Sequence, residues 1–214
     1  MKKSWEKIWK KKIYWVQSEP TKNITYFYNY HLKNFKKNSR ILDYGCGNCR
    51  NFNFLVDKGF DVYGTDISKS VIAQNKKKFP KFKNNLFLGD LKKINFKSNF
   101  FDSIISDASL YYQTKKEMFD TVEKFYEIMK KNGIIRIYTK SIYDNYYFDH
   151  KRKNSFEYIV KNKHWENGLL ITFLNFRDLK KLFSKFKKVK IGIETFNYIN
   201  HKRNHSYWVV TAKK

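Results

Sequence analysis

The sequence contains only two cysteines and two prolines, and its eight glycines form no glycine-rich stretch. So few cysteines exclude a small secreted domain held together by several disulfides. Because there is no proline- or glycine-rich linker, residues 1–214 are expected to fold as one domain. No apolar run approaches the roughly 20 residues that a membrane-spanning helix needs. Residues 1–12 are basic but lack the apolar core of a secretory signal, which favours a cytoplasmic location.

Acidic residues are also scarce: 19 Asp and Glu stand against 45 Lys and Arg, for a formal net charge of +26. A surplus of this size is typical of proteins that bind nucleic acid. Here the lysines are spread along the chain, and Asn, Phe, Tyr and Ile are abundant, as an AT-rich genome favours. We therefore interpret most of the surplus as solvated surface that favours anionic small molecules. A surface that binds a polyanion remains the alternative.

The two cysteines, Cys46 and Cys49, form a C-x-x-C pair, a spacing found in redox pairs and in half of a zinc site. No second pair of cysteines exists to complete a site of four thiolates. The remaining His, Cys and carboxylate residues show no metal-ligand spacing. We expect the two thiols to pack inside a glycine turn, and we predict no metal site.

Short apolar segments alternate along the chain with amphipathic ones. Strands are expected at 41–44, 61–65, 86–88, 101–106 and 134–139. Helices are expected between them, the longest with Met118, Val122, Phe125 and Met129 on one stripe. The segments 189–195 and 207–212 are too close for a crossover helix and predict an antiparallel hairpin. The pattern predicts an α/β sandwich of three layers, with a mostly parallel seven-stranded sheet and one antiparallel strand.

Two segments stand outside this alternation. Residues 1–38 predict two helices, the first with Trp5 and Trp9 at helical spacing and the second beginning after Thr21 as its N-cap. Residues 143–173 are irregular and rich in aromatic side chains. We expect the first segment to form a lid and the second a cap over a substrate.

Four acidic side chains follow predicted strands: Asp43, Asp66, Asp90 and Asp107. A single Asp after a strand is a common turn residue. Four of them are expected at one edge of a parallel sheet, where such sheets bind ligands. The glycines that follow Asp43 let the backbone approach a ligand closely, and Asp66 can accept hydrogen bonds from ribose hydroxyls. The sequence therefore predicts a site for a nucleotide-like cofactor.

These residues resemble the motifs of class I S-adenosylmethionine-dependent methyltransferases. The run Asp43-Tyr44-Gly45-Cys46-Gly47 matches the family's first motif, with Cys49 in place of the third glycine. The run Lys131-Asn132-Gly133-Ile134 looks like the turn before the family's fifth strand. The resemblance covers nearly the whole chain and implies a Rossmann-like fold with S-adenosylmethionine as cofactor. Within the family, the chain looks most like the small-molecule branch that includes tellurite-resistance and thiopurine-type enzymes.

The resemblance also implies roles for individual residues. Gly45 and Gly47 would lie against the methionine part of the cofactor, with Asp43 ordering water or the amino group there. Asp66 would hold the ribose hydroxyls and Asp90 would reach the adenine amino group. Asp107 would line the cavity in which the methyl group is transferred. The further candidates for cofactor binding are Asn48, Ile67 and Leu91.

Two other functions remain open. A dinucleotide-dependent oxidoreductase would need a glycine three positions after Gly47, where this chain has Arg50. A protein that binds the cofactor without catalysis is harder to exclude, because no motif fixes a catalytic residue.

The methyl acceptor is indicated mainly by what the site lacks. Enzymes that methylate base amines carry a proline pair after the fourth strand, and residues 107–112 contain no proline. Cytosine-carbon enzymes need a cysteine nucleophile, and both cysteines lie in the glycine turn. We therefore predict O- or N-methylation of a small polar metabolite, such as a sugar or surface-glycan precursor, with RNA as the alternative.

A hydroxyl acceptor usually also needs a base. The catalytic candidates are Asp107, Tyr111, His150 and His164. Other side chains expected near the cavity are Tyr14, Trp15, Tyr112, His201 and His205.

Overall fold

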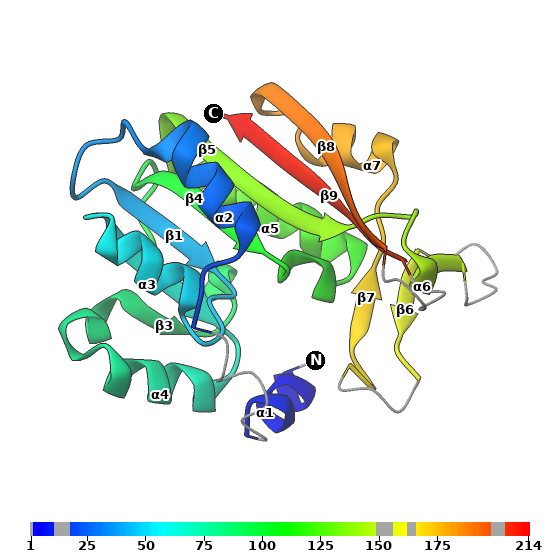
Figure 1. Ribbon diagram of the computed structural model, residues 1–214, viewed down its shortest axis with the longest axis horizontal. Coiled ribbons are helices and arrows are strands. Elements are labelled where there is room, and N and C mark those ends of the chain that lie inside the picture. The colour runs from blue at the N-terminus through cyan, green and yellow to red at the C-terminus, as the bar shows by residue number, and fades with distance from the viewer. Residues whose placement is uncertain (1, 11–17, 149–155, 162–165, 198–203) are drawn as a thin grey trace.

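The computed structural model describes residues 2–10, 18–148, 156–161, 166–197 and 204–214. At its centre lies a seven-stranded sheet in the order β3-β2-β1-β4-β5-β9-β8 (Figure 1). The strands are β1 (Arg40–Tyr44), β2 (Asp61–Asp66), β3 (Leu86–Leu88), β4 (Phe101–Asp107), β5 (Met129–Lys140), β8 (Lys187–Asn197) and β9 (Asn204–Lys213). Strands β1 to β5 pair in parallel, whereas β9 runs antiparallel to both β5 and β8. The predicted sheet with one antiparallel strand from a C-terminal hairpin is confirmed.

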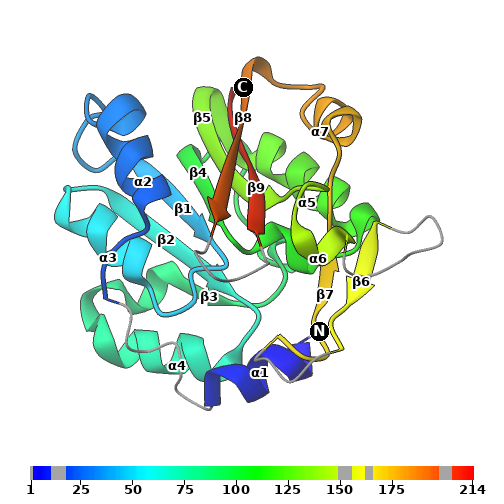
Figure 2. The same cartoon turned by 45° about the vertical axis from the view of Figure 1, so that its right-hand side comes forward.

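Helices cover both faces of this sheet (Figures 1 and 2). One face carries α2 (Lys22–Phe27) with its π-helical extension η1 (Tyr28–Leu32), α3 (Arg50–Asp57) and α4 (Lys69–Lys78). The other face carries α5 (Lys115–Ile128) and α7 (Phe176–Leu182). Neighbouring strand residues face opposite layers, so Ile41 packs with Phe52 of α3 while Leu42 packs with Phe125 of α5. This alternation builds one core on each side of the sheet.

Polar side chains begin several helices, and Thr21 is an N-cap that the sequence predicted. Thr21 accepts a hydrogen bond from the amide of Ile24, and Ser68 accepts one from Val71. Helix α5 begins with a capping box between Thr114 and Glu117. Such caps satisfy amides that the first helical turn leaves without partners, and each stabilises its helix by about 1 kcal/mol.

Met129 corrects one prediction. It was expected on the α5 stripe, but α5 ends at Ile128 and Met129 is the first residue of β5, where it pairs with Phe101. Its side chain is still fully buried in the same core as the α5 stripe. Helical spacing alone therefore could not separate the two assignments. The expected break at 131–133 occurs inside β5, as a register shift against β4 with Asn132 at φ +64°.

The predicted cap segment contains regular structure that the sequence pattern did not reveal. It holds α6 (Asn145–Phe148) and a small antiparallel sheet of β6 (Glu157–Ile159) and β7 (Leu170–Thr172). Both views place this hairpin and α1 (Lys2–Lys10) beyond the end of the main sheet where β1 and β4 finish (Figures 1 and 2). Among the described residues, no helix is long and apolar enough to cross a membrane.

Candidate active site

The turn after β1 depends on its two glycines. Gly45 has φ +72° and Gly47 has φ +50°, in the left-handed region that glycine adopts most readily. The amide of Gly45 donates to the carbonyl of Thr65 at 2.8 Å, which ties the turn to the end of β2. A Cβ at Gly45 would lie 2.3 Å from the Cβ of Ser109, in the loop after β4. The turn is thus fixed between the ends of three neighbouring strands.

Asp66, the last residue of β2, points at this turn. Its carboxylate accepts hydrogen bonds from the amide of Gly47 at 3.1 Å and from the amide of Ser68 at 2.8 Å. Burial raises the pKa of Asp66 to about 6, although these amides and that of Ile67 oppose the rise. The carboxylate therefore lies where a ligand seated on the glycine turn would meet it, and it takes up a proton just below neutral pH.

Asp43 is the most deeply buried of the four predicted acids, at 2% exposure. Its carboxylate is held by the amide of Phe52 in the first turns of α3, and Oδ2 has no hydrogen-bond partner among the described residues. Burial raises the pKa of Asp43 to about 8, and the charge of Asp107 adds to the rise. A buried acceptor without a partner, beside a turn open to a ligand, fits a cationic amino group.

Asp107, at the end of β4, anchors the segment that leads into α2. Its Oδ2 accepts from Thr21 Oγ1 at 2.6 Å and from Asn51 Nδ2 at 3.0 Å, and its Oδ1 accepts from Asn23 Nδ2 at 3.0 Å. Both oxygens are thus bonded to the protein. The structure places Asp107 next to Asp43, as the pKa of Asp43 reflects, and gives it a positioning role toward residues 21–23.

The other predicted cofactor residues lie at the margins of the turn. Asp90 begins the short 3-10 helix η3 (Leu91–Lys93), and its Oδ1 accepts from the amide of Lys92 at 3.0 Å. The Leu91 side chain is fully buried in the core next to α5. Asn48 is also buried, and its Oδ1 accepts from the amide of Arg50 at the start of α3. The structure therefore groups Asp43, Asp66 and Asp107 around the turn, with Asp90 beyond the end of β3.

The two cysteines are buried and unbridged. The pKa of the Cys46 thiol is raised well above its usual range by its hydrogen bond with Cys49 and by burial. A redox or zinc-binding cysteine needs the opposite shift, since the thiolate is the reactive form. The packing role predicted for the pair fits this environment.

Helix α1 covers the glycine turn. Its Glu6 carboxylate accepts from Ser68 Oγ at 2.8 Å and from the amide of Ser70 at 3.2 Å, at the start of α4. The ring of Trp9 lies against the turn, because a Cβ at Gly47 would come within 3.0 Å of its Cζ2. Sequence spacing predicted this helix and its apolar side chains, and the contact with Gly47 shows where it docks.

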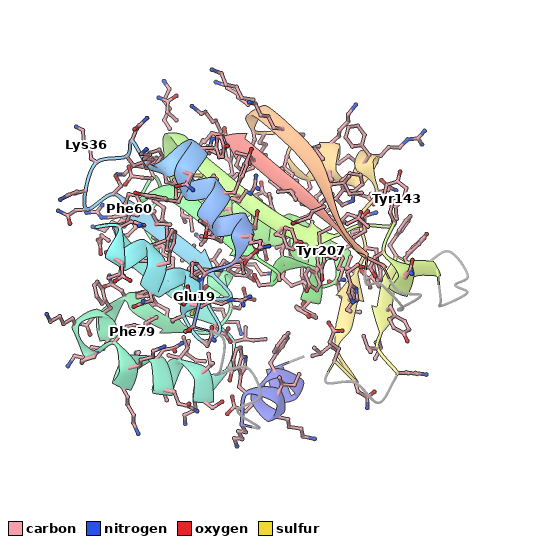
Figure 3. All side chains as sticks on the ribbon, viewed as in Figure 1. Glu19, Lys36, Phe60, Phe79, Tyr143 and Tyr207 are labelled. Carbon is pink, nitrogen blue, oxygen red and sulfur yellow. The ribbon has the colours of Figure 1, made fainter. Side chains whose placement is uncertain are left out.

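A cluster of aromatic side chains lies beyond the ends of β4 and β5. Trp5 of α1 meets Tyr112 edge to face at 4.8 Å, and Tyr112 donates to Glu166 near the β6–β7 hairpin at 2.8 Å. Tyr111 packs beside Tyr112, and Tyr207 at the start of β9 completes this side (Figure 3). Helix α1 therefore bridges the glycine turn and this aromatic cluster.

Of the predicted catalytic candidates, the structure describes Asp107 and Tyr111. Tyr111 is 3% exposed, and burial together with the charge of Tyr112 raises its pKa well above the usual range. Because this phenol is buried and hard to deprotonate, it suits packing at the edge of a cavity better than the role of a base. The other candidates His150, His164, His201, Tyr14 and Trp15 lie outside the described residues. His205 is described, and it lies two residues before Tyr207 on β9.

Comparisons with known proteins agree with this architecture. Residues 42–137 match the family described as "Methyltransferase domain". Over 99 residues, or 45% of this chain, the sequence is 30% identical to the "Putative methyltransferase YqeM" of Bacillus subtilis. The chain spans only 40% of the length of that relative.

Solved structures show the same fold at lower sequence identity. A SAM-dependent methyltransferase from Methanosarcina mazei superposes with a TM-score of 0.66 at 15% identity, covering 85% of this chain and 96% of that one. The 1,6-didemethyltoxoflavin-N1-methyltransferase of Burkholderia thailandensis, solved with S-adenosylhomocysteine, gives 0.65 at 14% identity, with 97% and 83% covered.

Residues 42–137 thus match a methyltransferase domain, and most of the chain shares the fold of solved methyltransferases, with the sheet order and glycine turn described above.

Proposed function

We propose that the protein transfers a methyl group from S-adenosylmethionine to an oxygen or nitrogen of a small polar metabolite. The observation that carries this proposal is the position of α1. Trp9 contacts the glycine turn at Gly47, while Trp5 contacts Tyr112 over the ends of β4 and β5. The acceptor must meet the cofactor beneath this helix. A covered site of this kind excludes water and suits a small molecule better than a polymer.

The residues around the turn suit the cofactor chemically. Asp66 would accept hydrogen bonds from the ribose hydroxyls, and Gly45 and Gly47 would let the backbone approach the methionine part. The partnerless Oδ2 of Asp43 would receive the amino group, and Asp90 would lie toward the adenine. When bound, S-adenosylmethionine supplies an electrophilic methyl group on a sulfonium sulfur. The chain's own residues then have to hold and activate the acceptor.

The basic composition favours an anionic acceptor, and a sugar or surface-glycan precursor is the one we favour. Three further assignments belong to this proposal: a lid formed by residues 1–38, a substrate cap formed by residues 143–173, and a cytoplasmic setting. The narrower likeness to tellurite-resistance and thiopurine-type enzymes stays a prediction.

Turnover assays with two classes of acceptor test the proposal. The purified protein is incubated with S-adenosylmethionine and either a panel of small hydroxyl and amine acceptors, sugar phosphates included, or bulk RNA. Release of S-adenosylhomocysteine is measured. We expect release with at least one small acceptor and none above background with RNA. Methylation of RNA without turnover of any small acceptor would overturn the proposal, and no turnover at all would favour a binding protein.

A further inference from the structure

A buried group of charges lies at the same edge of the sheet, outside the residues that would hold the cofactor. Lys140 Nζ lies 2.6 Å from Asp144 Oδ2, and their side chains are 1% and 0% exposed. The Nδ1 atom of His205 lies 3.3 Å from Lys140 Nζ and 3.4 Å from Asp144 Oδ2. The amide of Ser206 also donates to Asp144 Oδ2, at 2.9 Å. We refer to these three side chains as the Lys140–Asp144–His205 cluster.

Two parts of the chain build the cluster. Lys140 is the last residue of β5, Asp144 follows in the turn before α6, and His205 is on the first part of β9. Burial of a charged pair costs free energy that tightly packed apolar side chains would not. The fold therefore holds a costly arrangement at an edge where an acceptor is expected.

Strand register places His205 on the acceptor side of that edge. Asp107 pairs with Tyr138, and Lys140 pairs with Tyr207. Alternate residues of a strand share a face, so His205 lies on the same face as Tyr207, two residues beyond the point where β9 pairs with the last residue of β5. Tyr207 stacks on Tyr138 at 4.4 Å, and its ring centroid is 4.0 Å from Lys140 Nζ. Figure 3 labels Tyr207 at the end of the sheet that faces α1.

The burial of the three side chains differs in a way that suggests a division of roles. Lys140 and Asp144 are closed off, whereas the His205 side chain is 29% exposed. Burial raises the pKa of Asp144, but hydrogen bonding from His205 and the charge of Lys140 outweigh it, so the pKa is lowered overall. In the tautomer with Nδ1–H, the ionised Asp144 accepts from the imidazole and Nε2 is the acceptor nitrogen, whereas in the other tautomer Nδ1 accepts from Lys140.

We propose that His205 is the general base for a hydroxyl acceptor, with Asp144 and Lys140 as its positioning residues. The proposal rests on the proposed function and narrows its acceptor to a hydroxyl. The O–H bond of the acceptor breaks and its proton moves to Nε2 of His205. The electron pair stays on oxygen, which would form the new bond to the methyl carbon while the methyl–sulfur bond breaks and its electron pair stays on sulfur. The proton then leaves to solvent through the exposed edge of the ring.

The test begins with the imidazole itself, because that measurement needs no known acceptor. In protein labelled with ¹⁵N-histidine, long-range ¹H–¹⁵N correlation spectra distinguish the two neutral tautomers. His205→Gln identifies the His205 signals, and His31→Gln, in η1, serves as the matched control. We expect the Nδ1–H tautomer in the wild type and its loss in Asp144→Asn. An Nε2–H tautomer in the wild type would overturn the proposal, because that nitrogen could not take a proton.

Kinetics then separate a base from a structural residue. With a small hydroxyl acceptor from the turnover panel, His205→Gln is expected to lower kcat by about 10² to 10⁴-fold with little change in KM. Added imidazole should restore part of the rate in His205→Ala. In His205→Gln, the pH profile of kcat/KM should lose its acidic limb. The ionisable groups next to this histidine are Lys140 and Asp144, with Tyr207 and its β8 partner Glu194 on the same face of the sheet. A His205→Gln variant with the wild-type rate would contradict the proposal.

Cofactor binding keeps the two proposals distinguishable. Calorimetric affinity for S-adenosylhomocysteine is expected to be the same in the wild type, His205→Gln and His31→Gln. If all three fail to bind, the proposed function fails, while the tautomer still reports on His205. If all three bind and no small hydroxyl acceptor is methylated but an amine is, the base assignment to a hydroxyl acceptor fails alone.

Discussion

The two halves of the sheet's carboxyl edge are assembled in different ways. On the cofactor half, the decisive contact joins Gly47 to Asp66, only 19 residues apart. On the acceptor half, Tyr112 meets Glu166 across 54 residues, and Lys140 meets His205 across 65. The central contact of the first half thus lies within one short stretch of sequence, although Ser109 and Trp9 also pack on the turn, whereas these two contacts of the second half join distant segments. The structure of the cofactor half depends on the backbone conformation of the glycine turn, and that of the acceptor half depends on buried side chains.

The largest expected effect is on the acceptor half. Lys140→Met leaves Asp144 buried without its ammonium partner, and removal of one member of a buried pair costs about 3–5 kcal/mol of unfolding free energy. The double variant Lys140→Met/Asp144→Leu, which removes both charges, should recover most of this loss. Urea unfolding measures both. A single variant that costs less than about 1 kcal/mol would show that the pair is solvated in solution.

The matching test on the cofactor half is Gly45→Ala. Its Cβ would come 2.3 Å from the Cβ of Ser109 at φ +72°, so both a clash and backbone strain oppose the change. We expect a loss of about 2–4 kcal/mol of unfolding free energy together with loss of cofactor binding. Gly168→Ala is the control, since its φ is +81° but nothing lies within 4 Å of its Cβ. That control should cost only about 1 kcal/mol. Equal costs would mean that Ser109 moves aside.

Cofactor affinity should depend on pH through the two buried carboxylates. The pKa of Asp66 is raised to about 6 and that of Asp43 to about 8, so both are partly protonated near neutral pH. In the proposed site, the cofactor binds to the ionised forms of both side chains. Affinity for S-adenosylhomocysteine should therefore rise by about tenfold per unit from pH 6 to 8, and fall by up to about a hundredfold per unit below pH 6, where both carboxyl groups must lose a proton.

The sign for folding is the opposite. A carboxyl group with a raised pKa binds more protons in the folded state, so the cofactor-free protein loses stability as pH rises from about 4 to 8. Asp66→Asn should remove the step in affinity near pH 6, and Asp43→Asn the step near pH 8. Calorimetry across this pH range checks both variants, and a flat wild-type profile would contradict the assignment.

The smallest expected effects come from substitutions in α1, whose two tryptophans contact different halves of the sheet edge. Trp9→Ala should weaken binding of S-adenosylhomocysteine by about tenfold, because its ring covers Gly47. Trp5→Ala should leave that affinity unchanged and raise KM for the acceptor by a similar factor, because its ring packs on Tyr112. Calorimetry and steady-state kinetics on the same two variants separate these outcomes. Identical effects of both substitutions would show that α1 acts as one undivided lid.

The same contrast explains what the sequence could predict. The positions of the main strands, the glycine turn and the places of Asp43 and Asp66 follow from local patterns, because each depends on residues close in sequence. The hydrogen bonds of Asp107 to Thr21 and Asn23 do not, since they span 86 and 84 residues. Apolar periodicity also could not find the β6–β7 hairpin, whose strands contain only three residues each.

The histidines show this limit most clearly. The expected cap makes His150 and His164 candidates, and both lie outside the described residues. His205 carries no sequence motif, and what distinguishes it is the pairing of β9 with β5 next to Lys140. The pattern that could have singled it out is the aromatic Tyr207 two positions later on the same strand face. The register between β5 and β9, which the sequence does not give, is what places Tyr207 and His205 beside Lys140.

The central claim is that the glycine turn and Asp66 form a working S-adenosylmethionine site. Calorimetric titration of the full-length protein with S-adenosylhomocysteine at pH 8 tests it directly. The account predicts binding of one molecule per chain, weakened by about 10 to 100-fold in Asp66→Ala, the loss of one or two hydrogen bonds. Absence of binding in the wild type, or unchanged affinity in Asp66→Ala, would contradict it.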